Sequence, residues 1–326
     1  MRIIVFGVGA VGGAVAAALE GNGVPVIGIA RGRQLEAVLA RGLRLRSPVY
    51  DRVSRFECVS NPAEIAFQAD DMILLCMKTQ DTEAALEQLR AAGVREQPIF
   101  CVQNGVANER IALRRFANVH GVTVMLPASF LEPGEVAAFC EPKFGVFDIG
   151  RYPHGLDADD ARLVAAFDGS MIAGFENADV MASKYSKLLF NLGNILQAAV
   201  GREVDTKPIS ERLRAEAKTV FRTAGISLAW GDAGDTDPAR ADLMRWGDLP
   251  TDITRVGGST AQSLARGAGS VETDYMNGEI SLLGRLHGVP TPLNDAMCDL
   301  GARLVHQNAV PGAMTIDDLH RLLPAD

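Results

Sequence analysis

A glycine-rich turn between an apolar strand and a helix of small residues makes up the first twenty positions of this chain. Residues 2–6 are apolar and rich in β-branched side chains, as buried parallel strands are. Residues 7–13 follow at once with the pattern G-x-G-x-x-G, and residues 14–19 have the composition of a helix that packs on a sheet. A strand before this pattern and a helix after it are the context that dinucleotide binding requires.

Each glycine of the pattern has a separate physical role. Gly7 permits the tight turn, Gly9 lets the backbone approach a pyrophosphate, and Gly12 lets the helix pack on the strand. The helix that follows offers free N–H groups and the positive end of its dipole to the phosphates. The alternative is a loop that keeps the pattern without binding. The predicted cofactor-binding residues of this segment are Gly7, Val8, Gly9, Ala10, Val11 and Gly12.

The end of the second strand bears on the choice of dinucleotide. Residues 23–30 have the pattern of a strand, and Arg31 and Arg33 follow it. An NAD-binding fold places an acidic residue about twenty residues past the glycines, where it binds the ribose 2′-hydroxyl. No acid stands there, and arginine suits a 2′-phosphate because its donors form a planar fork. The sequence therefore predicts NADP (NADPH) rather than NAD, unless both arginines are merely solvated.

Two further buried strands end in polar residues. Lys78 follows residues 71–77, and Asn104 follows residues 97–102. In open α/β sheets, ligands bind outside the carboxyl ends of the strands. The glycine turn, Arg31, Lys78 and Asn104 should therefore lie at one edge of one sheet and form a cofactor site.

The length of 326 residues suggests two domains. In the first we expect a small β pair from residues 43–46 and 53–59, antiparallel strands at 135–139 and 143–149 on the far side of the sheet, and a last strand at 171–175. Strand patterns stop after residue 177. The rest predicts helices over residues 179–200, 210–230, 271–287 and 292–308, with a loop or broken helix over 231–252. We therefore expect an α/β domain over residues 1–177 and a mainly α-helical domain over 178–326.

A polar stripe runs along the first predicted helix of the second domain. At 100° per residue, Lys187, Asn191 and Asn194 share one face, with apolar residues around them. Amides and an ammonium in an apolar setting need partners, which favours a binding site. In the alternative, Lys187 reaches solvent and the asparagines cap local backbone. Lys184 lies 60° round the same helix and is the rival cation.

Two more polar clusters lie in the second domain. Ser259 and Thr260 offer hydroxyls suited to a carboxylate, within residues 257–262. Glu272 and Asp274 open an otherwise apolar helix. Acids in a first turn are commonly only partners of the helix dipole, and for these two that alternative is equally open.

The composition and net charge argue against several classes of binding partner. With a net charge of −8, the chain is not expected to bind nucleic acid or anionic membranes non-specifically. The five cysteines have no metal-binding spacing, and buried reduced thiols are expected. The first strand begins at residue 2, and no apolar run reaches the ~18 residues of a membrane span. We therefore expect a cytoplasmic protein with no signal peptide and no bound metal.

These features together resemble the ketopantoate reductase (2-dehydropantoate 2-reductase) family over nearly the whole chain. The matching pieces are residues 7–12, Lys78, residues 103–105, residues 187–191 and residues 272–278. The resemblance implies a Rossmann-type domain followed by a helical domain similar to the C-terminal domain of 6-phosphogluconate dehydrogenase. It also implies NADPH as cofactor, in agreement with Arg31.

The resemblance also implies roles for the polar residues. Lys187 would be the general acid, Glu272 would orient the lysine and the substrate, and Asn191 would hold the substrate. The residues matched by Lys78 and Asn104 line the cofactor and the reaction site. A serine upstream of Glu272 would contact the substrate carboxylate.

Two departures from the family pattern concern substrate contacts. The family's second asparagine comes eight residues after the lysine, where this chain has Ile195, and Asn194 is one residue early. The serine is one residue further from Glu272 than usual, which leaves Ser259 and Thr260 as rivals. Both departures bear on ketopantoate as the substrate more than on the reaction.

The sequence therefore predicts an NADP-dependent oxidoreductase that reduces a 2-keto acid in a cleft between the two domains. Reduction of 2-dehydropantoate to pantoate, in pantothenate biosynthesis, is the expected reaction. Lys187 would protonate the carbonyl oxygen. The alternatives are a reductase of the same fold that acts on another 2-keto acid or hydroxy acid, and a nicotinamide-sensing protein without catalysis. The oligomeric state is left open, with a homodimer among the options.

Overall fold

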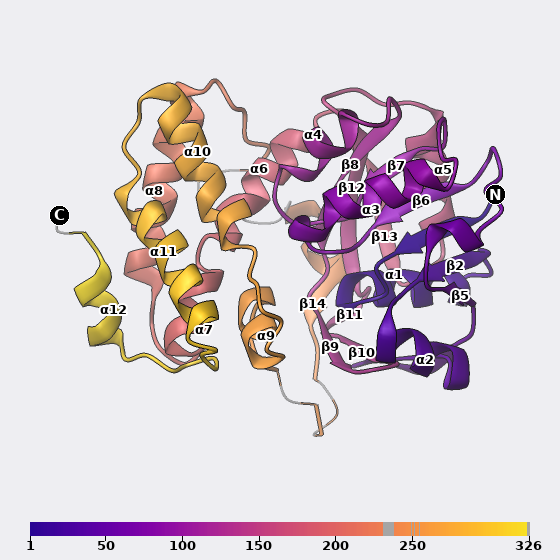
Figure 1. Cartoon of the computed structure of the whole chain (residues 1–326), viewed down its shortest axis with the longest axis horizontal. Helices are drawn as coiled ribbons and strands as arrows, with labels where there is room; N and C mark the ends of the chain where they lie inside the picture. Colours follow the sequence, from indigo (N-terminus) through magenta and orange to yellow (C-terminus); the bar gives the residue numbers. More distant parts are fainter. Residues whose placement is uncertain (231–237, 249, 251, 254, 325–326) are drawn as a thin grey trace. The chain divides into compact units, whose positions relative to one another are not determined.

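The structure, a computed structural model, describes residues 1–230, 238–248, 250, 252–253 and 255–324. The chain divides into two compact units (Figure 1). Unit 1 consists of Met1–Lys184 and Asp235–Ile253, and unit 2 consists of Tyr185–Gly234 and Thr254–Asp326. These units divide the chain differently from the ranges 1–177 and 178–326 expected from the sequence, because the described residues 238–248 belong to unit 1 and the first boundary falls after Lys184.

An eight-stranded sheet forms the centre of unit 1, in the order β13-β12-β8-β7-β6-β1-β2-β5. All neighbouring pairs are parallel except β12 and β8. The strands are β1 (Ile3–Phe6), β2 (Val26–Ile29), β5 (Glu57–Val59), β6 (Met72–Leu75), β7 (Ile99–Cys101), β8 (Val119–Met125), β12 (Gly145–Arg151) and β13 (Ile172–Glu176). The connections are α1 (Ala10–Gly21), α2 (Gly32–Arg41), η1 (Pro62–Glu64), α3 (Thr79–Ala91), α4 (Asn108–Leu113) and α5 (Ala158–Phe167). The predicted Rossmann-type domain is confirmed.

Alternate residues of the central strands enter two different cores. Ile3 and Val5 join the core formed with α1 and α5, whereas Ile4 and Phe6 join the core formed with α3 and α4. This period of two is what a sheet covered on both faces requires. It explains why the first strand is apolar at every position.

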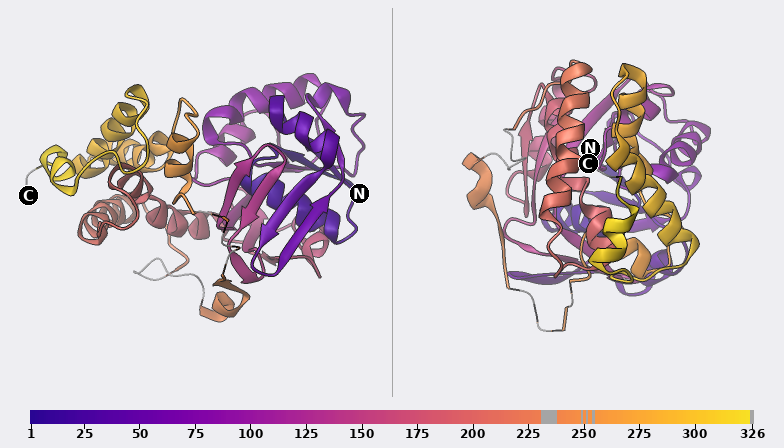
Figure 2. Two further views of the ribbon diagram at one scale, coloured as in Figure 1. Left: turned by 90° about the horizontal axis from the view of Figure 1, so that it is seen from below. Right: turned by 90° about the vertical axis from the view of Figure 1, so that its left-hand side faces the viewer.

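A second sheet of four strands packs over α1, in the order β4-β3-β10-β9 (Figure 2). Its strands are β3 (Leu43–Ser47), β4 (Tyr50–Ser54), β9 (Ala128–Glu132) and β10 (Glu135–Ala138). Two sequence expectations are corrected here. Residues 53–59 split between β4 of this sheet and β5 of the large sheet, and β10 pairs with β3 and β9 rather than with the far edge of the large sheet. Such long-range pairing leaves no signature in local periodicity.

The expectation that strands stop after residue 177 was wrong. The strand β14 (Met244–Trp246) pairs antiparallel with β11 (Cys140–Pro142), and the 3₁₀ helix η2 (Pro238–Leu243) precedes it. The guanidinium of Arg240 lies over the ring of Phe175, 3.9 Å from its centroid, and pairs with Asp148. These contacts hold the described part of this segment on unit 1. The expected loop over residues 231–252 lies partly outside the described residues.

Unit 2 is helical, as predicted. Its elements are α6 (Val180–Asn191, which begins in unit 1), α7 (Asn194–Val200), α8 (Lys207–Thr223), α9 (Ser259–Ala265), η3 (Thr273–Tyr275), α10 (Asn277–His287), α11 (Pro292–His306) and α12 (Ile316–Leu322). Proline in the first turn of α8 and α11 and a left-handed Gly288 after α10 set helix ends in the usual way. Within the described residues, no helix is both long and apolar enough to cross a membrane.

The single helix expected over residues 179–200 is two helices. α6 ends at Asn191 and α7 starts at Asn194. A Cβ on Gly193 would lie 3.1 Å from the Oγ of Ser210 on α8, so the glycine lets α8 approach closely. Glycine inside a helix costs about 1 kcal/mol relative to alanine, which favours a break at this point. The helical wheel that placed Asn194 beside Lys187 therefore does not apply.

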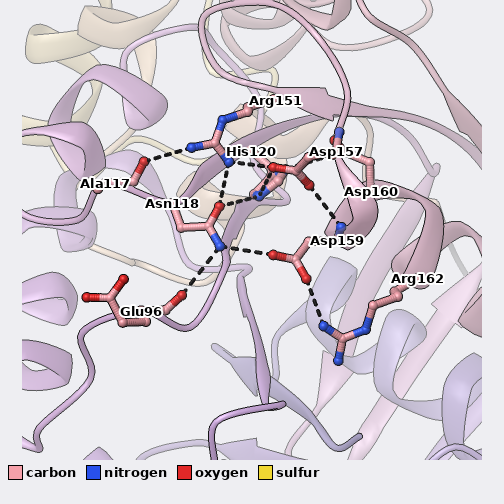
Figure 3. A network of polar contacts seen from close by, with 9 residues as sticks. All are labelled: Glu96, Ala117, Asn118, His120, Arg151, Asp157, Asp159, Asp160 and Arg162. Carbon is pink, nitrogen blue, oxygen red and sulfur yellow. Dashed lines mark hydrogen bonds and ion pairs between the residues drawn. The ribbon is translucent and has the colours of Figure 1, made fainter.

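A buried polar network joins β8, β12 and α5 (Figure 3). The ring of His120 is fully buried, with Nδ1 2.7 Å from Asp160 Oδ1 and Nε2 3.0 Å from Asn118 Oδ1. Asn118 Oδ1 also accepts from Arg151, and Asn118 Nδ2 donates to Asp159. Because that oxygen is an acceptor, Nε2 of His120 must carry a hydrogen.

Three residues of the same network are close enough together to be considered as metal ligands. Ligand atoms of His120, Asp157 and Asp159 lie within 4.8 Å of one another. Arg151 pairs with Asp157 at 2.5 Å, and Arg162 pairs with Asp159 at 2.8 Å. Both carboxylates are thus neutralised by guanidinium groups, and the arrangement fits a structural brace between elements rather than a metal centre.

Replacement of His120 by leucine should lower the free energy of unfolding by about 1–3 kcal/mol, the cost of leaving a buried polar group without one of its partners. Asp160, fully buried, would lose the contact to Nδ1. Urea unfolding measures the effect, and His154→Leu is the control because His154 is exposed. Wild-type stability of the His120 variant would contradict the bracing role.

Candidate active site

The glycine turn after β1 has the geometry that its sequence predicts. Gly7 has φ +102°, and a Cβ there would lie 2.8 Å from the backbone nitrogen of Met77. A Cβ on Gly12 would lie 2.1 Å from the carbonyl oxygen of Gly7. A Cβ on Gly9, in contrast, would meet no atom of the described residues within 4 Å. The turn is therefore closed toward the sheet and open at Gly9, as the approach of a pyrophosphate requires.

The start of α1 is available for an anion. Its N-cap residue Gly9 offers no side chain to the first-turn N–H groups, and Ala10 and Val11 are only partly buried. Val8 differs from these neighbours because its side chain lies in the core. Val8 can therefore meet a ligand only through its backbone.

Sequence reasoning missed Gln34, which holds the glycine turn in place. Its Nε2 donates to the carbonyl of Val8 at 2.8 Å, and its Oε1 accepts from the backbone of Gly134 at 2.7 Å. The residue joins the turn after β1 to the turn between β9 and β10. A glutamine in a helix carries no sequence signal for such a link.

The two arginines after β2 are exposed. Arg31 is the N-cap residue of α2, and its guanidinium lies 3.5 Å from the carboxylate of Asp81, with 74% of the side chain accessible. An exposed pair at this distance is weak and leaves the guanidinium able to meet another anion. Arg33 is exposed on the first turn of α2.

Lys78 and Asn104 lie at the same sheet edge as the glycine turn. Lys78 is the N-cap residue of α3, three residues after the end of β6, and Asn104 comes three residues after the end of β7. Since β2, β1, β6 and β7 are parallel neighbours, their carboxyl ends share one edge. The chain reverses its winding between β1 and β6, which is where ligands bind in doubly wound sheets. Gly7, Arg31, Lys78 and Asn104 therefore lie at one edge of the sheet, as the sequence predicted. That they bind a cofactor stays a prediction.

Lys184, expected as a rival of Lys187, has a different environment. Its side chain is 3% exposed, and its ammonium contacts Glu109 Oε1 at 2.7 Å and two backbone carbonyls of unit 1. Burial raises the pKa of Glu109, and Lys184 opposes that rise. Lys184→Ala would leave the Glu109 carboxylate buried without its cation, so it cannot serve as a neutral control for Lys187.

On unit 2, Lys187 and Asn191 lie one helical turn apart on α6. Lys187 is partly buried, and Asn191 is 8% exposed with its Nδ2 3.8 Å from the sulfur of Met276. This contact places the segment before α10 against the end of α6. Glu272, 8% exposed, opens that segment as the N-cap residue of η3.

Asn277, the asparagine of the last motif, holds the break between α6 and α7. Its Nδ2 donates to the carbonyl of Leu192 at 3.2 Å and to Asn294 Oδ1 at 3.0 Å. Asn294 in turn donates to Glu216, which also accepts from the first N–H groups of α11. The motif therefore contains a residue with a structural task that sequence reasoning did not assign.

Asn194, at the start of α7, lies close to the segment that carries Ser259 and Thr260. Asn194 is the first residue of α7, and its Oδ1 lies 3.1 Å from the position that a Cβ on Gly258 would take. Ser259 follows directly at the start of α9 and is partly buried, whereas Thr260 is 6% exposed. Of the two rival hydroxyls, that of Ser259 is therefore on the more accessible residue.

The thiols are reduced and poorly ionised. Burial raises the pKa of Cys58 to about 11 and that of Cys298 to about 12, and it raises the pKa of Cys76 and Cys101 as well. Thiolate, the reactive form, is therefore scarce near neutral pH at these four residues.

Comparison with known proteins agrees with this geometry. The family model for ketopantoate reductase PanE/ApbA matches residues 3–153, and its C-terminal counterpart matches residues 179–304. The 2-dehydropantoate 2-reductase of Archaeoglobus fulgidus is 28% identical over 92% of this chain and 96% of its own, and that of Pyrococcus horikoshii is 26% identical over 90% and 94%.

Solved structures share the fold. A PanE/ApbA family ketopantoate reductase from Ralstonia eutropha has a TM-score of 0.76 and 27% identity, with 94% of this chain and 99% of that chain covered. D-mandelate dehydrogenase, in a ternary structure with NADH and anilino(oxo)acetate, has a TM-score of 0.76 and 21% identity over the same shares. The two family models together cover most of both units. The chain therefore belongs to the ketopantoate reductase PanE/ApbA family of dinucleotide-binding oxidoreductases.

Proposed function

We propose that this protein is an NADPH-dependent reductase of a 2-keto acid, with 2-dehydropantoate, reduced to pantoate, as the expected substrate. The observation that carries the proposal is the cluster on unit 2. There Asn191 contacts Met276, four residues after Glu272, and Asn194 lies beside Gly258, next to Ser259. An oxoacid offers a carbonyl and a carboxylate, and this cluster offers an ammonium, amides and a hydroxyl to bind them.

Lys187 is assigned the role of proton donor. An ammonium beside the carbonyl oxygen stabilises the negative charge that develops there and supplies the proton that completes the alcohol. Glu272 is assigned to hold Lys187 and the substrate, because a carboxylate that is 8% exposed needs donors close by. Asn191, Asn194 and Ser259 are assigned to the polar ends of the substrate, with Thr260 as the rival hydroxyl.

The coenzyme is assigned to residues of the first 177 positions, and substrate binding with catalysis to residues 178–326. The open position at Gly9 and the uncapped start of α1 fit a pyrophosphate. Arg31, exposed after β2, fits a 2′-phosphate, and Lys78 and Asn104 complete the site. When bound, the nicotinamide supplies the hydride. A cytoplasmic location and a homodimer remain predictions from the sequence.

Two alternatives keep their place beside this proposal. The early Asn194 and the displaced Ser259 favour a related reductase with another 2-keto acid or hydroxy acid as substrate. A nicotinamide-sensing protein would bind NADPH without turnover. NADPH oxidation with a panel of 2-keto acids separates the three: turnover fastest with 2-dehydropantoate supports the proposal, turnover with another acid supports the first alternative, and binding alone supports the second.

Lys187→Ala should lower kcat by about 10²–10⁴, the usual contribution of a general acid. NADPH affinity should barely change, because the coenzyme is assigned to other residues. The matched control is Lys207→Ala, since Lys207 is an exposed lysine on α8, with 77% of its side chain accessible. Near-normal kcat of the Lys187 variant with its best substrate would remove this residue from the mechanism.

Arg31→Asp should weaken NADPH binding by ~1.5–3 kcal/mol, the range of a charge-assisted hydrogen bond. NADH serves as the control ligand because it lacks the 2′-phosphate. The variant should bind NADH as tightly as the wild type does. Fluorescence titration of each reduced coenzyme gives both values. Equal loss for NADPH and NADH, or no loss for either, would show that Arg31 does not select the coenzyme.

Gly9→Ala and Gly12→Ala should have opposite effects. A methyl at Gly9 meets open space in the protein, so the variant should unfold at the wild-type urea concentration while NADPH binding weakens by about 1–3 kcal/mol from steric overlap. A methyl at Gly12 overlaps the carbonyl of Gly7, so that variant should lose about 3 kcal/mol or more of unfolding free energy. Normal NADPH affinity of Gly9→Ala would place the pyrophosphate elsewhere.

A further inference from the structure

Lys184 is a buried cation whose ammonium lies among oxygens of unit 1. Its Nζ contacts Glu109 Oε1 at 2.7 Å, the carbonyl of Gln103 at 2.8 Å and the carbonyl of Val122 at 3.1 Å. An ammonium has three N–H groups, and three oxygens surround this one. Because the ammonium is buried among these three oxygens, we look for the role of Lys184 in the residues that it contacts.

The buried carboxylate of Glu109 needs a cation close by, and Lys184 supplies it. The carboxylate is fully buried on α4, and within the described residues neither of its oxygens has a hydrogen-bond partner, although Oε1 lies 2.7 Å from the ammonium of Lys184. A buried carboxylate is tolerated only with a close cation. The pair thus fixes the ammonium at one place, next to the carbonyl of Gln103.

Gln103 lies two residues after the end of β7. Its side-chain amide contacts the loop between β6 and α3 and the first turn of α3. Its Nε2 donates to the carbonyl of Met77 at 2.9 Å and to Thr82 Oγ1 at 2.8 Å. Gln103 is therefore held by Lys184 at its main chain and by the β6–α3 loop at its side chain.

Asn108 forms the other end of the same link. Its Nδ2 donates to the carbonyl of Asn104 at 3.1 Å and to Thr79 Oγ1 at 3.2 Å, and its Oδ1 accepts from Thr82 at 2.8 Å. Asn108 and Gln103 are both less than 5% exposed. The loop after β6 and the loop after β7 are thus one hydrogen-bonded body.

These two loops carry Lys78 and Asn104. We propose that Lys184 and Glu109 are a positioning pair, which holds the carbonyl of Gln103 and thereby sets where Asn104 and Lys78 meet the coenzyme. The inference rests on the proposed function, because Lys78 and Asn104 are assigned to the coenzyme there. The pair itself touches neither coenzyme nor substrate.

The obvious alternative is that the pair only stabilises the fold. Replacing a buried ion pair by apolar residues of similar volume is often neutral for stability, so Lys184→Met combined with Glu109→Leu separates the two roles. In the structural alternative this double variant folds and binds NADPH normally. In our proposal it folds but no longer holds the Gln103 carbonyl.

The expected result is an NADPH dissociation constant raised about tenfold, the equivalent of one hydrogen bond to a charged group, with a similar rise in KM for NADPH. KM for the 2-keto acid should change less than twofold. The matched control is Lys207→Met with Glu211→Leu, an exposed i,i+4 pair on α8. Circular dichroism and thermal unfolding report folding of both.

A second double variant, Lys184→Gln with Glu109→Gln, removes the charges but keeps hydrogen-bonding groups. It should recover part of the lost NADPH affinity. If the apolar variant does not fold, the amide variant decides: at least a threefold rise in the NADPH dissociation constant supports the proposal. Wild-type NADPH affinity in either folded variant overturns it.

The positioning role is tested by NADPH binding, whereas the proposed function is tested by turnover, so the two can fail separately. NADPH fluorescence needs no substrate, so the positioning role is measured even if no 2-keto acid is reduced. Failure of the proposed function appears instead as a wild-type protein without turnover on the substrate panel.

Discussion

The close approach of α1 to the ends of β1 and β6 is the constraint on which unit 1 depends. Gly12 brings the helix within van der Waals range of the carbonyl of Gly7, and Gly7 brings the turn against Met77. Any side chain at either position would push the helix off the sheet. The same contact leaves the first turn of α1 uncapped and directed at the sheet edge where Lys78 and Asn104 lie. The close packing of α1 and the open N–H groups of its first turn therefore have one cause.

Unit 2 depends on a break rather than on a continuous helix. Ending α6 at Asn191 exposes the carbonyl of Leu192, which Asn277 then satisfies from the start of α10. A buried carbonyl without a donor would cost stability, so the last motif and the Lys187 helix are joined by a structural need. This link brings the segment that starts at Glu272 to the end of the helix that carries Lys187. The grouping of polar residues follows from the way the chain satisfies its own backbone.

The two lysines of α6 differ in how deeply they are buried. The buried ammonium of Lys184 donates to two carbonyls and lies 2.7 Å from the carboxylate of Glu109, whereas Lys187 is only partly buried. In a helix, residues three apart lie on nearby faces, so sequence spacing alone could not separate them. The separation comes from residues more than sixty positions away, in a loop, a strand and helix α4 of unit 1.

What the sequence by itself determined was local. The glycine turn, the Rossmann-type domain, the helical nature of unit 2 and the polar strand ends all follow from periodicity and from residues whose conformational needs are special, such as Gly7 with its positive φ. Tertiary structure decided the rest. The pairing of β10 with β3, the return of β14 to unit 1 and the division of residues 179–200 into two helices depend on partners far along the chain. So do the tasks of Gln34, Lys184 and Asn277, because a long-range hydrogen bond leaves no pattern in neighbouring residues.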